Sequence, residues 1–70
     1  MEKKIDMNAH KYNILRNHLI FSEWKDKVKI IVDLLGFMPE IIVFPLNCIY
    51  IENKNNIVKI FPENVVWEKK

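Results

Sequence analysis

The sequence is short of several residue types, and each shortage removes a class of protein. Cys48 is the only cysteine, so no disulfide can form within one chain. Gly36 is the only glycine, which excludes the glycine-rich loops that cradle phosphate groups. Arg16 is the only arginine, and arginine is the side chain best suited to reading guanine or clamping phosphate. Nucleotide-binding loops and disulfide-stabilised scaffolds are therefore excluded.

Long hydrophobic runs are also missing. The longest apolar stretch, residues 41–46, contains Pro45 and falls far short of the ~20 residues that span a bilayer. No apolar run follows the charged first residues, so we expect no signal peptide. A lone free thiol and the lack of an Asn-x-Ser/Thr sequon suit a reducing compartment. These features predict a cytoplasmic protein without a membrane segment, in its own cell or in a host cytoplasm.

The composition that remains is apolar and nearly neutral. Half of the 70 residues are hydrophobic, and the net charge is +2, which is low for a dedicated nucleic-acid binder of this size. The length predicts a single domain over residues 1–70. Eleven Ile, ten Lys and eight Asn, against one Ala, indicate AT-rich codons. We interpret this bias as the mark of a low-GC bacterium, a phage or a mobile element.

The first half of the chain, residues 8–36, has helical periodicity. Residues 22–35 are predicted to form an amphipathic helix, with Ser22 as its N-cap and Gly36 as a left-handed C-cap. A weaker helix is predicted over residues 8–20, and two helices are favoured over one bent helix. The apolar sector of the second helix contains four residues one turn apart: Trp24, Val28, Ile31 and Leu35.

The second half, residues 40–67, has the composition of β-strands. Pairing Glu52 with Ile57 across the asparagine-rich loop 53–56 places only β-branched residues on one face of a hairpin, whereas the other face is mixed. The predicted fold is α+β, with one or two N-terminal helices packed on a three- to four-stranded antiparallel β-meander. The expected strands are 41–44, 46–52, 57–61 and 65–67.

Few residues point to catalysis. His10 and His18 are eight positions apart, about 80° around a helix, which does not suit a metal pair. Cys48 lies in a predicted strand without a neighbouring cation, so we expect it to pack rather than react. The carboxylates are scattered singly. We therefore expect no enzyme activity, no metal site and no cofactor.

Surplus apolar and aromatic residues favour protein binding instead. A domain this small has one core, and the residues left outside it would form an exposed patch typical of interfaces. The sequence predicts a non-catalytic module, such as a phage- or mobile-element-type inhibitor of a host defence or nucleic-acid enzyme. Its expected binding residues are on the mixed face of the sheet: Tyr50, Lys59, Phe61 and Trp67.

Two other functions remain open. Self-association into a structural homodimer could cover the same surplus apolar surface, and it does not exclude a further partner. A small nucleic-acid-binding protein is the second alternative, and its cations would be Lys25, Lys29 and Arg16.

Overall fold

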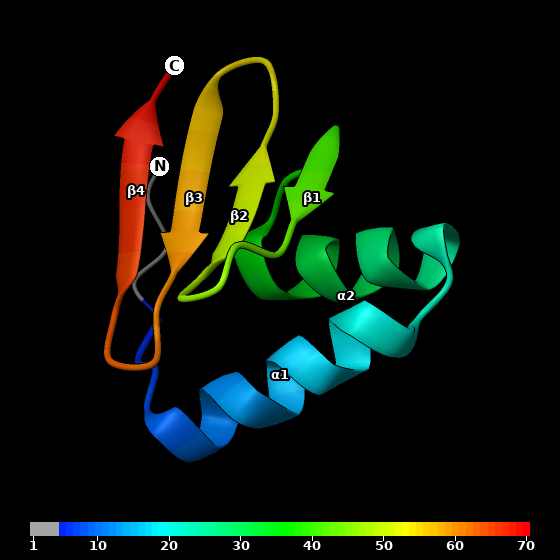
Figure 1. The fold of residues 1–70 in the computed structure, drawn as a ribbon. Helices are drawn as coiled ribbons and strands as arrows, with labels where there is room; N and C mark the ends of the chain where they lie inside the picture. The colour runs from blue at the N-terminus through cyan, green and yellow to red at the C-terminus, as the bar shows by residue number, and fades with distance from the viewer. Residues whose placement is uncertain (1–4) are drawn as a thin grey trace.

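The computed structural model describes residues 5–70 and has an α+β architecture, with two helices followed by an antiparallel sheet (Figure 1). The strands are neighbours in chain order, β1-β2-β3-β4, so the sheet is a four-stranded meander. This confirms the predicted fold class. The elements are α1 (Ala9–Phe21), α2 (Trp24–Leu35), β1 (Ile41–Val43), β2 (Ile49–Glu52), β3 (Asn56–Ile60) and β4 (Val65–Lys69).

The break between the two helices is at Ser22 and Glu23, which both have extended backbone conformations. Asn8 caps α1, because its side chain accepts a hydrogen bond of 2.8 Å from the backbone N–H of Lys11. The prediction that Ser22 caps the second helix is wrong. Its hydroxyl instead donates to the carbonyl of His18 at the end of α1, and Glu23 takes the N-cap position without a side-chain hydrogen bond.

Gly36 ends α2 in the left-handed conformation, at φ 87°, and donates its N–H to the Val32 carbonyl at 2.8 Å. The predicted C-cap is therefore confirmed. Trp24 was expected in the buried sector of this helix, but about half of its surface is exposed. Figure 1 shows the reason, since the corner between α1 and α2 extends beyond the outer edge of β1, where no strand can cover it.

The predicted hairpin register is confirmed, with Glu52 opposite Ile57 in the β2–β3 pair. Strand β2 begins later than expected, because Leu46 and Asn47 form a turn. In the β2–β3 loop the Asn53 side chain accepts hydrogen bonds from the N–H groups of Asn55 and Asn56, at 2.9 and 2.7 Å. Asparagine thus shapes this loop through its side chain, and no non-glycine residue between 5 and 70 has a positive φ.

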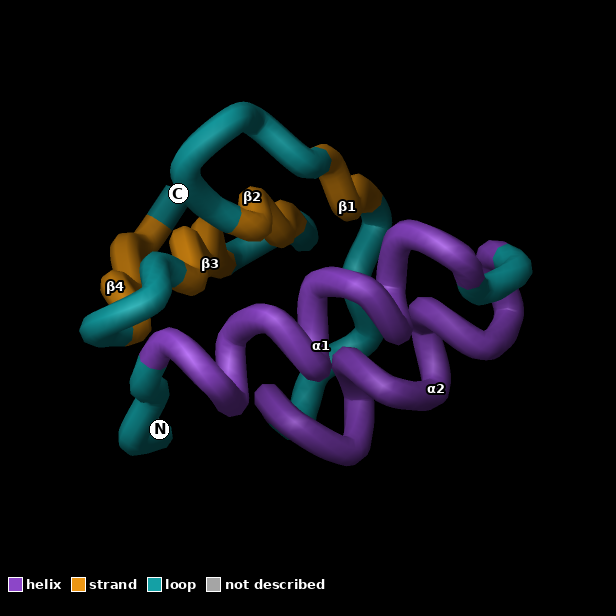
Figure 2. The backbone as a smooth tube through the Cα atoms, turned by 60° about the horizontal axis from the view of Figure 1, so that its bottom comes forward, coloured by secondary structure: helices purple, strands orange, loops and turns teal. Residues whose placement is uncertain are grey.

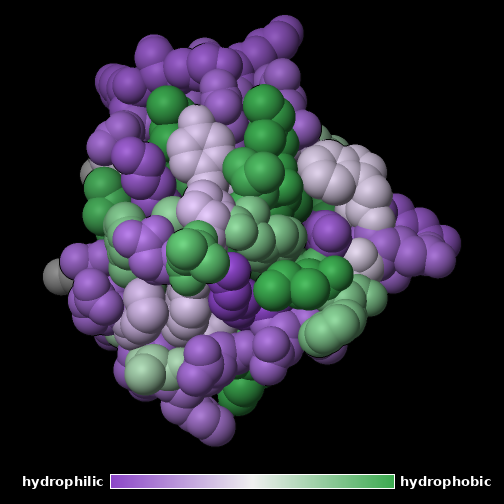
Figure 3. Space-filling view, viewed as in Figure 1, coloured by the Kyte–Doolittle hydropathy of each residue, from purple (hydrophilic) through white to green (hydrophobic). Residues whose placement is uncertain are grey.

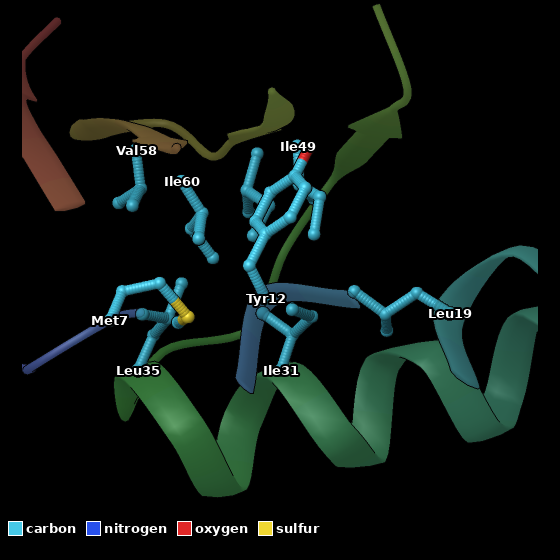
Figure 4. Packing of buried hydrophobic residues seen from close by; sticks show 9 residues of the cluster. Met7, Tyr12, Leu19, Ile31, Leu35, Ile49, Val58 and Ile60 are labelled. Carbon is cyan, nitrogen blue, oxygen red and sulfur yellow. The ribbon is translucent and has the colours of Figure 1, made fainter. Parts of the chain in front are cut away.

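The core lies between the sheet and the helices, which both cover the same face of the sheet (Figure 2). Figure 4 shows side chains of β2 and β3 meeting those of α1, α2 and Met7. The aliphatic face of the hairpin is fully buried, as the β-branched pattern predicted. The buried cluster contains Met7, Tyr12, Leu19, Ile31, Leu35, Ile49, Ile51, Val58 and Ile60.

Candidate protein-binding surface

Within residues 5–70, no helix or strand covers the face of the sheet that is turned away from the helices, and we call this face the open face. The strand register defines its residues, because side chains alternate between the two faces of each strand. The open face holds two rows across the four strands, with one residue from each strand in each row. The rows are Val43, Tyr50, Lys59 and Val66, and next to them Ile41, Glu52, Ile57 and Glu68.

Aliphatic side chains on the open face are concentrated at the outer strand β1. Ile41 is 44% exposed and Val43 is 47% exposed, although both are large apolar residues. Ile57 and Val66 add half-buried aliphatic surface on β3 and β4. Figure 3, viewed from the same side as Figure 1, shows green hydrophobic atoms gathered near the centre of this view and surrounded by polar ones. The most exposed aliphatic surface of the open face thus lies at the β1 edge, beside the polar side chains of Tyr50 and Glu52 on β2.

The charged residues of the open face are paired with one another. Lys70, directly after β4, forms an ion pair with Glu52, and Tyr50 donates its hydroxyl to Glu52 Oε2 at 2.9 Å. Lys59 Nζ lies 4.0 Å from Glu68 Oε1. Two carboxylates and two ammonium groups thus leave this surface without net charge.

The Tyr50–Glu52–Lys70 contacts shift the ionisation of all three groups. The hydrogen bond from Lys70, followed by that from Tyr50, lowers the pKa of Glu52. The pKa of Tyr50 is raised, chiefly because its hydroxyl donates to Glu52, and the pKa of Lys70 is raised by its bond to the same carboxylate. Over the physiological pH range Glu52 therefore stays ionised, while Tyr50 and Lys70 keep the protons that they donate to it.

The structure separates the four residues that the sequence assigned to the mixed face. Tyr50 and Lys59 lie directly opposite each other on the open face. The placement of Trp67 there is wrong: it pairs with Val58 on the core face and meets Phe37 edge to face, with ring centroids 5.9 Å apart. Phe61 directly follows β3 and lines a groove between α1 and the β1–β2 and β3–β4 connections. The other residues that line this groove are Tyr12, Asn13, Arg16, Leu46, Asn47, Pro62 and Glu63.

Ile41, Val43 and Val66 also lie on the open face, and no binding role was predicted for them from the sequence. No alternation in the sequence marked Ile41 and Val43 as outward-facing, because Ile42 between them is hydrophobic too, although it packs against the core in the structure. The register of β4 had no such signal, because Val65, Val66 and Trp67 are all hydrophobic.

The three cations of the nucleic-acid alternative do not form one surface. Lys25 and Lys29 are exposed on α2, whereas Arg16 is half-buried on α1. The Arg16 guanidinium donates to the carbonyls of Cys48 and Pro45, at 2.8 and 3.0 Å, and so holds the β1–β2 connection. It also donates to the Tyr12 hydroxyl at 3.0 Å and stacks 5.6 Å from the centroid of the Phe44 ring.

The groups considered for catalysis are not assembled into a site. Cys48 is buried, as its packing role predicted, and both histidines are exposed on α1. Among residues 5–70, no three His, Cys, Asp or Glu side chains gather where they could bind a metal ion. Within the same range, neither helix has the length and apolar character needed to cross a membrane. No protein-family model matches the chain, and comparisons with curated proteins and with solved structures return no match either.

Proposed function

We propose that this chain is a non-catalytic protein-binding module that contacts its partner with the open face of the sheet. The observation that carries the proposal is the exposure of Ile41 and Val43 on an uncovered sheet face, next to Tyr50. Burying such aliphatic surface against a partner is worth about 25 cal/mol per Å². The charged side chains beside it, on β2, β3 and β4, are paired with one another and can keep their ion pairs in the complex.

The form of the partner follows from the same surface. The open face has no net charge, so it favours a partner whose contact region is apolar and uncharged over a polyanion. The AT-rich codon bias supports a phage or mobile element as the source. Within the proposal, the partner is then a host protein, such as a defence or nucleic-acid enzyme, that the module inhibits or modulates.

The proposal is tested by affinity capture from lysate of a low-GC bacterium, with nuclease added. A variant carrying Val43→Lys and Tyr50→Ala alters only the open face, so it should fold but lose the captured protein. Lys29→Ala, on the exposed side of α2, is the matched control and should retain it. Retention of the same protein by the open-face variant would contradict the assignment of this surface.

Salt dependence separates the nucleic-acid alternative from this proposal. Capture through lysines falls steeply as salt rises, because each phosphate contact releases counterions. Capture through the open face should change little between about 50 and 200 mM salt. Material that disappears with nuclease and with Lys25→Ala or Lys29→Ala would favour nucleic-acid binding instead.

A further inference from the structure

Helix α1 carries apolar residues on two opposite sides. Tyr12 and Leu19 are buried against the sheet, whereas Ile14 is 57% exposed and Phe21 is 86% exposed. At 100° per residue, the exposed pair lies on the side of the helix opposite Tyr12 and Leu19. A globular domain normally buries one helix face and leaves the other polar. The second apolar side of α1 is therefore surplus to the fold.

We call this second side the outer stripe, and it consists of Ile14, Asn17, His18 and Phe21. The four residues fall within a sector about 100° wide along two turns of the helix. Together with Ser22 they line a shallow depression on the surface. The stripe contains no carboxylate and no ammonium group, so two copies of it can approach without like-charge repulsion.

We propose that the chain forms a two-fold symmetric dimer in which the outer stripes of two α1 helices pack antiparallel. A two-fold axis between Asn17 and His18 sets Ile14 of each copy opposite Phe21 of the other. Asn17 and His18 lie on opposite edges of the stripe, and the two-fold axis keeps each edge on its own side, so Asn17 of one copy faces Asn17 of the other near the axis. Two side-chain amides placed in this way can share hydrogen bonds. The stripe is therefore complementary to itself, as a two-fold interface requires.

The charges beyond the two ends of the stripe favour the same antiparallel arrangement. Lys11 lies one turn before Ile14, and Glu23 lies two residues after the end of the helix at Phe21. Antiparallel pairing brings Lys11 of each copy to the level of Glu23 of the other, and so forms two intermolecular ion pairs. A parallel arrangement would instead align lysine with lysine. Opposed helix dipoles add a further small preference for the antiparallel pair.

The dimer leaves the proposed binding surface free. Both helices lie on one side of the sheet and the open face lies on the other (Figure 2). Two copies joined through α1 would thus present two open faces, one at each end. Such a bivalent arrangement raises avidity toward a partner that is itself oligomeric.

Sedimentation equilibrium over about 10 µM to 1 mM protein tests the dimer, since one helix face per copy makes a small and weak interface. Phe21→Ser should raise the dimer dissociation constant by about tenfold or more. Leu46→Ser is the matched control, because Leu46 is 102% exposed but lies in the β1–β2 connection, beside Tyr12 and Arg16 and outside the outer stripe. A monomer throughout the range, or equal weakening by both variants, would overturn the proposal.

Cross-linking and charge reversal test the geometry. In a Cys48→Ala background, Asn17→Cys should form an intermolecular disulfide on mild oxidation, whereas Lys54→Cys in the β2–β3 loop should not. Lys11→Glu and Glu23→Lys should each weaken the dimer, and the double variant should restore it. A dimer that persists without the Asn17→Cys cross-link would place the interface elsewhere and refute the stripe. Phe21→Ser leaves the open face intact, so this result is separable from the proposed function.

Discussion

Replacing Arg16 should destabilise the protein more than replacing any other surface cation. Its guanidinium makes three hydrogen bonds, to the Tyr12 hydroxyl and to the carbonyls of Pro45 and Cys48, at 2.8–3.0 Å. It also stacks on the Phe44 ring. This one side chain thus joins α1 to the β1–β2 connection. Among residues 5–70, the hydrogen bonds found between the helix and this connection all come from Arg16.

The expected loss can be worked from these contacts. A hydrogen bond to a charged group contributes about 1.5–3 kcal/mol, and the partial exposure of Arg16 reduces that figure. We expect Arg16→Ala to lower the free energy of unfolding by about 2–3 kcal/mol in total. Domains of this size have a total stability of about 3–10 kcal/mol, so the loss is a large fraction of it.

Urea unfolding followed by circular dichroism measures the effect, and the midpoint should fall by about 1–2 M. Arg16→Lys should lie between the wild type and Arg16→Ala, because lysine keeps the charge but lacks the planar fork that reaches two carbonyls. Lys25→Ala is the control and should change stability by less than about 0.5 kcal/mol. An Arg16→Ala midpoint that matches this control would refute the structural role of Arg16.

Three further predictions concern single side chains. NMR titration should give Glu52 a pKa below its ordinary 4.5, and Lys70→Ala should raise that pKa more than Tyr50→Phe, because the Lys70 bond is the larger cause. Since the folded-state pKa of Glu52 is lowered and those of Tyr50 and Lys70 are raised, their contribution to stability should be full between about pH 4.5 and 10. This contribution to stability should fall as pH drops through the Glu52 pKa or rises above about 10. On the acid side, the stability of Lys70→Ala should depend less on pH than that of the wild type, because the larger cause of the lowered Glu52 pKa has been removed. Gly36→Ala should cost about 1 kcal/mol in thermal or urea unfolding, from the φ of 87° alone, because an added Cβ meets no atom within 4 Å. Ile51→Ala should cost about 2–5 kcal/mol in the same assay, because Ile51 is fully buried.

Local sequence patterns were sufficient to predict the structure where a short segment determines its own conformation. Asn8 and Gly36 have strong capping preferences, and both caps are present. The β2–β3 register was predictable because only one alignment makes a wholly β-branched face. These features depend on residues that are close together in the chain.

Features that depend on distant contacts were not predictable. Arg16 is 29 and 32 positions away from the carbonyls that it holds, so nothing near it in the sequence indicates that role. Trp67 was misplaced because three hydrophobic residues in a row fix no register, and the structure turns it toward Phe37 in the core. Trp24 matches a buried helix position, but the sheet ends before reaching it.

Photo-cross-linking from the open face tests the proposed binding surface most directly. A photo-reactive benzoylphenylalanine replaces Val43 on the open face or, as the control, Lys29 on α2, and both variants are irradiated in cells of a low-GC bacterium. The proposed function predicts a discrete, nuclease-resistant protein adduct from position 43 that disappears when Tyr50→Ala is added. No adduct from position 43, or the same adduct from position 29, would contradict protein binding by the open face.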